Sequence, residues 1–135
     1  MKAAKISAIV VIVYIGVVIS FESLLGYFQP AGQSTMVITA SDEDGSTNER
    51  VVARLEVDGT IYAAANHWPR AWYRQVLNNP NIELLLAEND GSRAYIATSV
   101  DGEEHERVDN ANSLGLVFRL LTGFPPRYFV RLEPR

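Results

Sequence analysis

The chain has 135 residues and carries 12 lysines and arginines against 16 aspartates and glutamates, a formal net charge of −4. An acidic chain lacks the basic face that nucleic acid binding requires, so we expect no nucleic acid partner. The absence of cysteine excludes disulfides, thiolate metal sites and cysteine nucleophiles. The length suits one domain with a modest hydrophobic core.

The first 28 residues differ in composition from the rest of the chain. Residues 6–21 are uncharged and almost entirely apolar. Extended through residue 28, a helix of this composition would cross the roughly 30 Å hydrocarbon core of a bilayer. Residues 1–28 are therefore predicted to be a membrane anchor that inserts residues 6–28, and residues 29–34 a linker. A cleaved signal peptide is the alternative, although no pair of small residues suited to cleavage follows closely. A buried core helix is disfavoured because the segment has no polar face.

Charges on the two sides of the apolar segment predict its orientation. Lys2, Lys5 and the free amino group precede the segment, whereas Glu22 and the acidic residues Asp42–Asp44 follow it. Positive charge favours the cytoplasmic side of a membrane helix. We therefore expect a single-pass protein with its amino terminus in the cytoplasm and its domain outside.

The first part of the domain has the pattern of strands. Thr35–Thr39 is strand-like and is followed by a polar loop, Ser41–Asn48. Apolar and polar residues alternate from Val51 to Val57, which indicates a half-buried strand. Asp58-Gly59 can supply the two positive φ angles of a tight hairpin, so we expect Ile61–Ala65 to return as the partner strand.

A segment rich in aromatic residues and arginine follows, from Asn66 to Pro80. Pro69 suits the first turn of a helix, where its missing N–H would have no partner, and Asn79-Pro80 ends that helix. The predicted helix places Trp72 on one face and Arg74 on the opposite face.

The remainder of the domain predicts three more strands and one more helix. The strands are expected at Ile82–Ala87, Ala94–Val100 and Tyr128–Leu132, and the helix at Leu114–Leu121. A polar run, Glu103–Asn112, lies between them, and its first four residues, Glu103–Glu106, are predicted to be a solvated turn. With about six strands and two helices in residues 35–135, hairpins dominate. We therefore expect a mainly β domain of the α+β class, an antiparallel barrel with helices at its ends.

Motifs that identify a reaction are scarce. His67 and His105 are the only histidines, and without cysteine they make a poor zinc site, so no metal is predicted. Nucleophile-elbow, dinucleotide-binding and P-loop patterns are all absent from the sequence, which argues against hydrolases and nucleoside triphosphatases. No catalytic residue is identified.

The start of the predicted helix after Asn66 is the best candidate for a binding site. The small residues Ala63–Ala65 before it leave room for a ligand near the backbone. A helix amino terminus beside Arg70 and Arg74 favours a phosphate or carboxylate, and a tryptophan could cover an aromatic ring. In the structural alternative, Trp72 plugs the barrel end, Trp68 packs at the helix start and the arginines pair with surface carboxylates.

Four short motifs follow one another along the domain. They are Asp58-Gly59-Thr60-Ile61-Tyr62, Pro69-x-x-Trp72-Tyr73, Asn79-Pro80-Asn81-Ile82-Glu83 and Val130-Arg131-Leu132-Glu133-Pro134. From about Met36 to Pro134 the chain resembles the deazaflavin (coenzyme F420)-dependent nitroreductase and quinone reductase family. Members of that family are split β-barrels related in fold to flavin-binding proteins of the pyridoxamine-phosphate-oxidase type.

The resemblance implies an oxidoreductase that holds a reduced deazaflavin or FMN and passes a hydride to a small acceptor, a quinone or a nitro compound. By position it implies that the cofactor is lined by Tyr62, Asn66, His67, Trp68, Arg70 and Trp72. The helix pattern adds Arg74 to this set. By analogy with other split barrels, the chain could form a homodimer.

One loop departs from the family pattern and supports a second function. Where the family usually has a basic loop for the cofactor's phosphate and acidic tail, this chain has the acidic residues Asp42–Glu49, which would repel that tail. The predicted orientation also separates the domain from cytoplasmic deazaflavin. The alternative is a non-catalytic, exported and membrane-tethered binding module that has lost the phosphate site.

Overall fold

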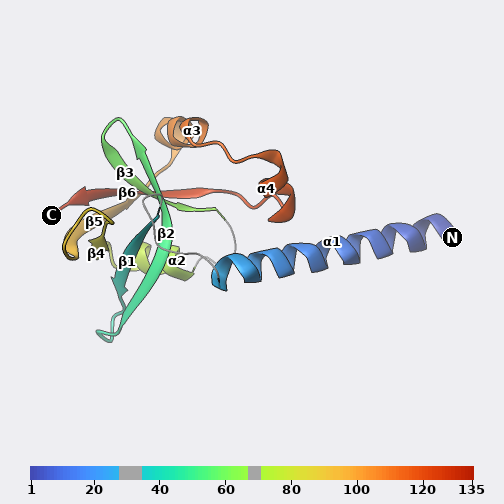
Figure 1. Ribbon diagram of the computed structural model, residues 1–135, viewed down its shortest axis with the longest axis horizontal. Coiled ribbons are helices and arrows are strands. Elements are labelled where there is room, and N and C mark those ends of the chain that lie inside the picture. The colour runs from blue at the N-terminus through green and yellow to red at the C-terminus, as the bar shows by residue number, and fades with distance from the viewer. Residues whose placement is uncertain (28–34, 67–70) are drawn as a thin grey trace. The chain divides into compact units, whose positions relative to one another are not determined.

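The computed structural model describes residues 1–27, 35–66 and 71–135 (Figure 1). The described helices are α1 (Lys2–Tyr27), α2 (Ala71–Asn78), α3 (Gly102–Ala111) and α4 (Leu116–Leu121). The described strands are β1 (Thr35–Ser41), β2 (Thr47–Val57), β3 (Thr60–Ala65), β4 (Asn81–Leu85), β5 (Arg93–Ser99) and β6 (Tyr128–Pro134). The chain divides into two compact units. One unit is α1 with Leu114–Pro125, and the other holds the strands, α2 and α3.

The described strands form a closed barrel in the order β1-β2-β3-β6-β5-β4. Every neighbouring pair is antiparallel. Closure leaves no exposed sheet edge in the barrel, which protects its strands from pairing with other chains. The predicted fold class, an antiparallel barrel of the α+β class preceded by an apolar helix, is confirmed.

The hairpin between β2 and β3 forms where the sequence predicts it. Asp58 and Gly59 have φ angles of +52° and +76°. Val57 on β2 pairs with Thr60 on β3, so only these two residues make the turn. Asp58 is one of few non-glycine residue types that tolerate positive φ, which explains why this dipeptide defines the register of the two strands.

The barrel encloses a core built from alternate residues of each strand. Met36, Ile38, Leu84 and Leu132 are among its buried members. Helix α2 packs on this core through Val76, with Trp72 and Tyr73 partly buried against it. The packing of Trp72 against the core is the arrangement that the structural alternative describes for this residue.

Helix α3 corrects the prediction that Glu103–Glu106 is a solvated turn. Val108 is its buried member and packs in a second apolar cluster with Tyr62 and Phe129. With few apolar residues, the segment lacks the periodicity that indicates a helix. Its first turn carries Glu103 and Glu104, whose charges favour a helix amino terminus. The described chain after α1 therefore has three helices, not the two that were predicted.

Helices α1 and α4 form the other unit. The most apolar 18-residue window within Lys2–Leu24 of α1 has a mean hydropathy of 2.4, and none of it is buried by the residues that the structure describes. By length and composition this helix can serve as a membrane anchor or a signal sequence. The ring of Phe118 on α4 packs edge to face on Phe21 of α1, with centroids 5.9 Å apart. The predicted linker, residues 29–34, lies outside the described residues.

Candidate functional site

Four of the seven predicted cofactor residues lie in the described part of the chain. Tyr62 belongs to β3, Asn66 follows β3 directly, and Trp72 and Arg74 belong to α2. The other three, His67, Trp68 and Arg70, lie outside the described residues.

Three aromatic side chains gather at one end of the barrel, where β3 ends and β6 begins. Ala65 on β3 pairs with Tyr128 on β6. The ring of Tyr128 stacks on Tyr73 of α2, with centroids 5.3 Å apart and planes 18° apart. Trp72 meets Tyr73 edge to face at 6.0 Å. We call Trp72, Tyr73 and Tyr128 the barrel-end aromatic group. Residues 67–70 connect β3 to the helix that carries two of its members.

Asn66 contacts a nearly buried arginine at the same end of the barrel. Its side-chain carbonyl accepts a hydrogen bond from Arg127 Nε at 2.9 Å. The Arg127 guanidinium also pairs with the Asp109 carboxylate, donates to the Asn112 carbonyl at 2.8 Å, and lies 4.9 Å from the centre of the Phe129 ring. Only 10% of the Arg127 side chain is exposed. Its charge is therefore neutralised within the barrel unit.

Tyr62 belongs to a polar network between β3, β6 and α3. It pairs across the strands with Arg131, and its hydroxyl donates to Glu104 Oε1 at 2.9 Å. Arg131 Nη1 donates to both oxygens of the same carboxylate, at 3.0 and 2.8 Å. Tyr62 itself is buried, with 1% of its surface exposed. The network holds α3 on the outer face of the sheet.

The network sets the charges of its members. Burial raises the pKa of the Tyr62 hydroxyl, and the Glu104 carboxylate beside it adds to the increase. For Glu104, burial opposes ionisation, but hydrogen bonds from Arg131 and Tyr62 outweigh it and hold the pKa below its ordinary value. At neutral pH Tyr62 is therefore a neutral donor and Glu104 an ionised acceptor.

Strand alternation separates two of the predicted site residues. Tyr62 faces α3 in the second apolar cluster, whereas its neighbour Ala63 and the helix residue Trp72 belong to the barrel core. Successive side chains of a strand point to opposite faces of the sheet. The structure therefore directs Tyr62 away from Trp72, and Asn66, through Arg127, contacts the α3 side as Tyr62 does.

Helix α2 presents one arginine to solvent beside an acidic loop. Arg74 is exposed and forms no ion pair with the residues that the structure describes. The next residue, Gln75, donates to both oxygens of Asp42 at 3.0 and 3.1 Å. The Ser46 hydroxyl and amide donate to Asp44 and lower the pKa of its carboxyl, so this loop keeps its negative charge. The acidic loop is thus attached to the helix that carries Arg74.

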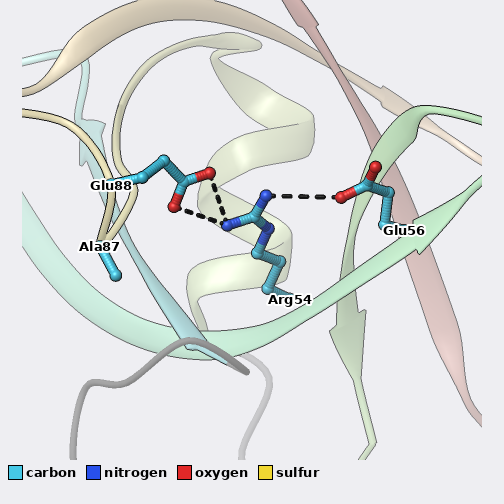
Figure 2. A pocket seen from close by; sticks show the side chains of 4 residues that line it. All are labelled: Arg54, Glu56, Ala87 and Glu88. Carbon is cyan, nitrogen blue, oxygen red and sulfur yellow. Dashed lines mark hydrogen bonds and ion pairs between the residues drawn. The ribbon is translucent and has the colours of Figure 1, made fainter.

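A pocket on the barrel unit is lined by Arg54, Glu56, Ala87 and Glu88 (Figure 2). Arg54 Nη1 lies 2.8 Å from the Glu88 carboxylate and Arg54 Nη2 lies 3.4 Å from that of Glu56. Two carboxylates therefore flank the one guanidinium, and the pocket offers no net positive charge to an anionic ligand.

Sequence reasoning missed the charged pairs between α3 and β6. Glu104 and Arg131 are 27 residues apart, and Asp109 and Arg127 are 18 apart, so no local spacing connects them. One signal was available. Arg131 lies between Val130 and Leu132 in the closing strand, and a charge in an apolar strand requires a partner. The described residues contain no group of three or more histidines, aspartates or glutamates that could hold a metal ion.

No protein-family profile and no curated protein sequence matches the chain. Its fold is shared by solved structures of low sequence identity. A chain described as a domain-swapped dimer aligns with a TM-score of 0.61 at 18% identity, covering 76% of this chain and 82% of that one. An F420-H2-dependent reductase, FDR-A, aligns with a TM-score of 0.57 at 19% identity, covering 75% of this chain and 95% of that one. The haem storage protein HutZ from Vibrio cholerae aligns with 0.56 at 14% identity, covering 86% of each chain.

These similarities confirm the split-barrel fold that the sequence motifs imply. The chain shares its fold with an F420-H2-dependent reductase and a haem storage protein. At these identities the comparison establishes the fold alone. Function must be argued from the site.

Proposed function

We propose that this chain is a membrane-anchored oxidoreductase that holds a flavin or deazaflavin at the end of the barrel marked by the barrel-end aromatic group. One observation carries the proposal. The helix that carries Trp72 and Tyr73 also presents an exposed arginine, Arg74, so groups suited to a ring and to a phosphate share one element. The fold shared with a deazaflavin-dependent reductase supports the same assignment.

The barrel-end aromatic group fits the flat ring of such a cofactor. Tyr128 is 39% exposed, so part of its surface is available to a ligand. Ala63–Ala65 on the adjacent strand are small and buried. Aromatic side chains bind flat rings by stacking or edge contacts. Asn66, held by Arg127, would offer hydrogen bonds to the ring edge.

The anionic part of the cofactor requires a cation. Arg127 and Arg131 are paired with carboxylates, so this role goes to Arg74 and to Arg70, four residues earlier on the same segment. Guanidinium groups bind phosphate through paired hydrogen bonds. The acidic loop attached to Gln75 disfavours a long acidic tail, so among these cofactors we expect FMN to bind more tightly than deazaflavin.

The bound cofactor would supply the hydride transfer, and the chain would bind and orient it. His67 and Trp68 would complete the lining between β3 and α2. Tyr62 would act at a distance, because its network with Glu104 and Arg131 keeps β3 and β6 in register beside the site.

Membrane attachment is part of the proposal. Residues 6–28 would cross the bilayer once, with the amino terminus in the cytoplasm and the barrel outside. This assignment is supported by the exposed apolar surface of α1 and by the position of the two lysines at its start.

We also propose that the barrel forms a homodimer. Leu85 on β4 and Ile96 on β5 expose 36% and 40% of their surface on the outside of the barrel. A solved structure of the same fold is described as a domain-swapped dimer. Size-exclusion chromatography with light scattering would give the mass, and a monomeric mass at micromolar concentration would contradict this part of the proposal.

A second function is favoured by one observation, the attachment of the acidic loop to α2. If its charge prevents phosphate binding, the protein is a non-catalytic, exported and membrane-tethered binding module for another ligand. Asp42 bonded to Gln75 is the contact that supports this alternative.

The two functions are separated by ligand titrations of the full chain in detergent. FMN, oxidised and reduced deazaflavin, and haem are added while tryptophan fluorescence is followed. The oxidoreductase proposal expects a flavin-type ligand to bind, and Arg70→Ala to weaken it about tenfold, the value of one charge-assisted contact. Arg93→Ala, an exposed arginine on β5, is the matched control and should change nothing. If no flavin-type ligand binds at millimolar concentration, the alternative stands.

A further inference from the structure

Helix α4 exposes an unusual amount of apolar surface for its length. Leu116 and Val117 are 72% and 70% exposed, and Leu120 and Phe124 are 48% and 46% exposed. Arg119 is the only charged residue between Leu114 and Pro125. A contiguous patch of this kind marks a surface that contacts something other than water.

The α4 segment contacts α1 between Tyr14 and Phe21. The Tyr14 hydroxyl donates to the Leu120 carbonyl at 2.8 Å, and Phe118 packs on Phe21. Gly123, with φ of +75°, lies so close that a Cβ there would be 3.3 Å from Val18. The apolar surface of α4 is therefore continuous with that of α1.

Three backbone carbonyls at the end of α4 accept hydrogen bonds from donors within the protein. The Phe118 carbonyl accepts from the Thr122 amide at 3.0 Å and from its hydroxyl at 2.9 Å. The Arg119 carbonyl accepts from the Phe124 amide at 2.8 Å, and the Leu120 carbonyl from Gly123 and Tyr14. Unpaired backbone groups are costly in hydrocarbon, so this arrangement suits a helix end placed in lipid.

A groove runs between the two helices of this unit. Its lining includes Val13, Gly16, Val17, Ser20 and Leu24 of α1 and Leu121 of α4. The one hydroxyl among these side chains, on Ser20, donates to the Gly16 carbonyl at 2.8 Å. The groove therefore presents a surface to which hydrocarbon, and not water, is complementary.

We propose that α4 is a second membrane-embedded element, which enters the bilayer from the side of the barrel and lies against α1, with a lipid bilayer as the occupant of its exposed face. The proposal rests on the anchoring function proposed above for α1. A helix rises 1.5 Å per residue, so Tyr14 lies about 20 Å and Phe21 about 9 Å along the axis from residue 27. Contacts at these two positions place α4 beside the middle of α1, at depths that lie within the roughly 30 Å hydrocarbon core.

Arg119 is compatible with this location. Its guanidinium carbon lies 5.5 Å from the centre of the Phe124 ring, and the residue is in the last turn of α4. An arginine at this depth opposes insertion, at a cost that falls where the long side chain reaches towards the interface. The seven Leu, Val and Phe side chains between Leu114 and Pro125 favour insertion and offset this cost.

The insertion would also change how the barrel is held. Leu114–Pro125 lies within the sequence of the barrel unit, which continues on both sides of it. A bilayer that holds both α1 and α4 would restrain the barrel at more than one point of the chain.

Single cysteines can test the proposal because the chain has none of its own. Val117→Cys probes α4, Ile12→Cys probes α1, and Glu106→Cys on α3 is the exposed control outside this unit. Each variant of the full chain is labelled with an environment-sensitive fluorophore and reconstituted in vesicles of phosphatidylcholine and phosphatidylglycerol. Quenching is measured with aqueous iodide and with lipids that carry a spin label on the acyl chain.

The proposal expects the labels at 117 and 12 to be quenched by the spin-labelled lipid and protected from iodide, and the label at 106 to show the reverse. If 12 is quenched by lipid and 117 by iodide, α1 is an anchor and the proposal for α4 is wrong. If both are quenched by iodide, the anchoring function fails as well. If 117 is protected from both quenchers, its partner is protein, which also overturns the proposal. Leu116→Cys repeats the α4 measurement at a second position.

Discussion

Helices α2 and α3 both pack on the barrel unit (Figure 1). Their charged side chains differ in whether they form ion pairs. The acidic side chains of α3 at Glu104 and Asp109 pair with Arg131 and Arg127 of the last strand and the residue before it. On α2, Arg74 is exposed and has no ion pair with any described residue. A charge that is neutralised inside the fold serves stability, whereas one left to solvent is available to a ligand. From this contrast we expect α3 to contribute to stability and α2 to the proposed binding site.

The largest expected effect comes from breaking the more buried of the α3 pairs. Arg127→Ala would leave Asp109 without its guanidinium and remove the bonds to Asn66 and the Asn112 carbonyl. We expect the free energy of unfolding to fall by about 3 kcal/mol, as for removal of one partner of a nearly buried pair. Thermal unfolding of the full chain in detergent measures it. Arg135→Ala, at an exposed end of the chain, is the control, and an equal loss there would remove the distinction.

A smaller loss of the free energy of unfolding is expected when the pair of Glu104 and Arg131 is broken. Glu104→Ala would leave Arg131 and the Tyr62 hydroxyl without their shared acceptor. Because about a quarter of the Glu104 side chain is exposed, water compensates in part, and we expect a loss of about 2 kcal/mol. Glu103→Ala, on the same first turn but exposed, should change stability by less than about 0.5 kcal/mol. Equal effects at 103 and 104 would show that the network contributes nothing.

On α2 we expect a substitution to change ligand affinity and not stability. Arg74→Ala should leave the unfolding temperature unchanged and weaken the binding of a phosphate-bearing flavin about tenfold, because one charge-assisted contact is lost. Fluorescence titration and thermal unfolding of the same variant give the two readouts. A loss of stability without a loss of affinity would assign Arg74 to structure and remove the contrast between the helices.

The smallest effect concerns pH. The folded pKa of Glu104 is lowered, so its contribution to stability is present above the pKa of the unfolded state and is lost as the pH falls through the folded value. Unfolding temperatures measured from pH 7 down to pH 3 should therefore fall below about pH 4.5. Glu104→Gln should flatten part of this decline. An identical profile in the variant would contradict the lowered pKa.

Local signals were sufficient for most of the barrel. The alternation from Val51 to Val57 and the Asp58-Gly59 turn predicted the β2–β3 hairpin, because strand period and positive φ are properties of a few adjacent residues. The alternation of residues did not indicate which face of β2 points into the barrel. Val52 faces the barrel core and Leu55 packs against the α3 side, so both faces of this strand are partly covered.

The candidate site was predicted in part. The segment from Asn66 to Arg74 was recognised because its tryptophans, proline and arginines lie close in sequence. Tyr128, which stacks on Tyr73, was not recognised, because the two residues meet only when β6 pairs with β3.

The sequence by itself determined the apolar helix at the start, the antiparallel strands with their turns, and the aromatic and arginine-rich segment, since each depends on short-range chemistry. Tertiary structure alone decided which charges are neutralised and which stay available. Glu104 meets Arg131, and α4 meets α1 at Tyr14, through contacts between residues far apart in the chain. Long-range pairing depends on how the whole barrel closes and how each helix packs, and no local pattern of residues encodes it.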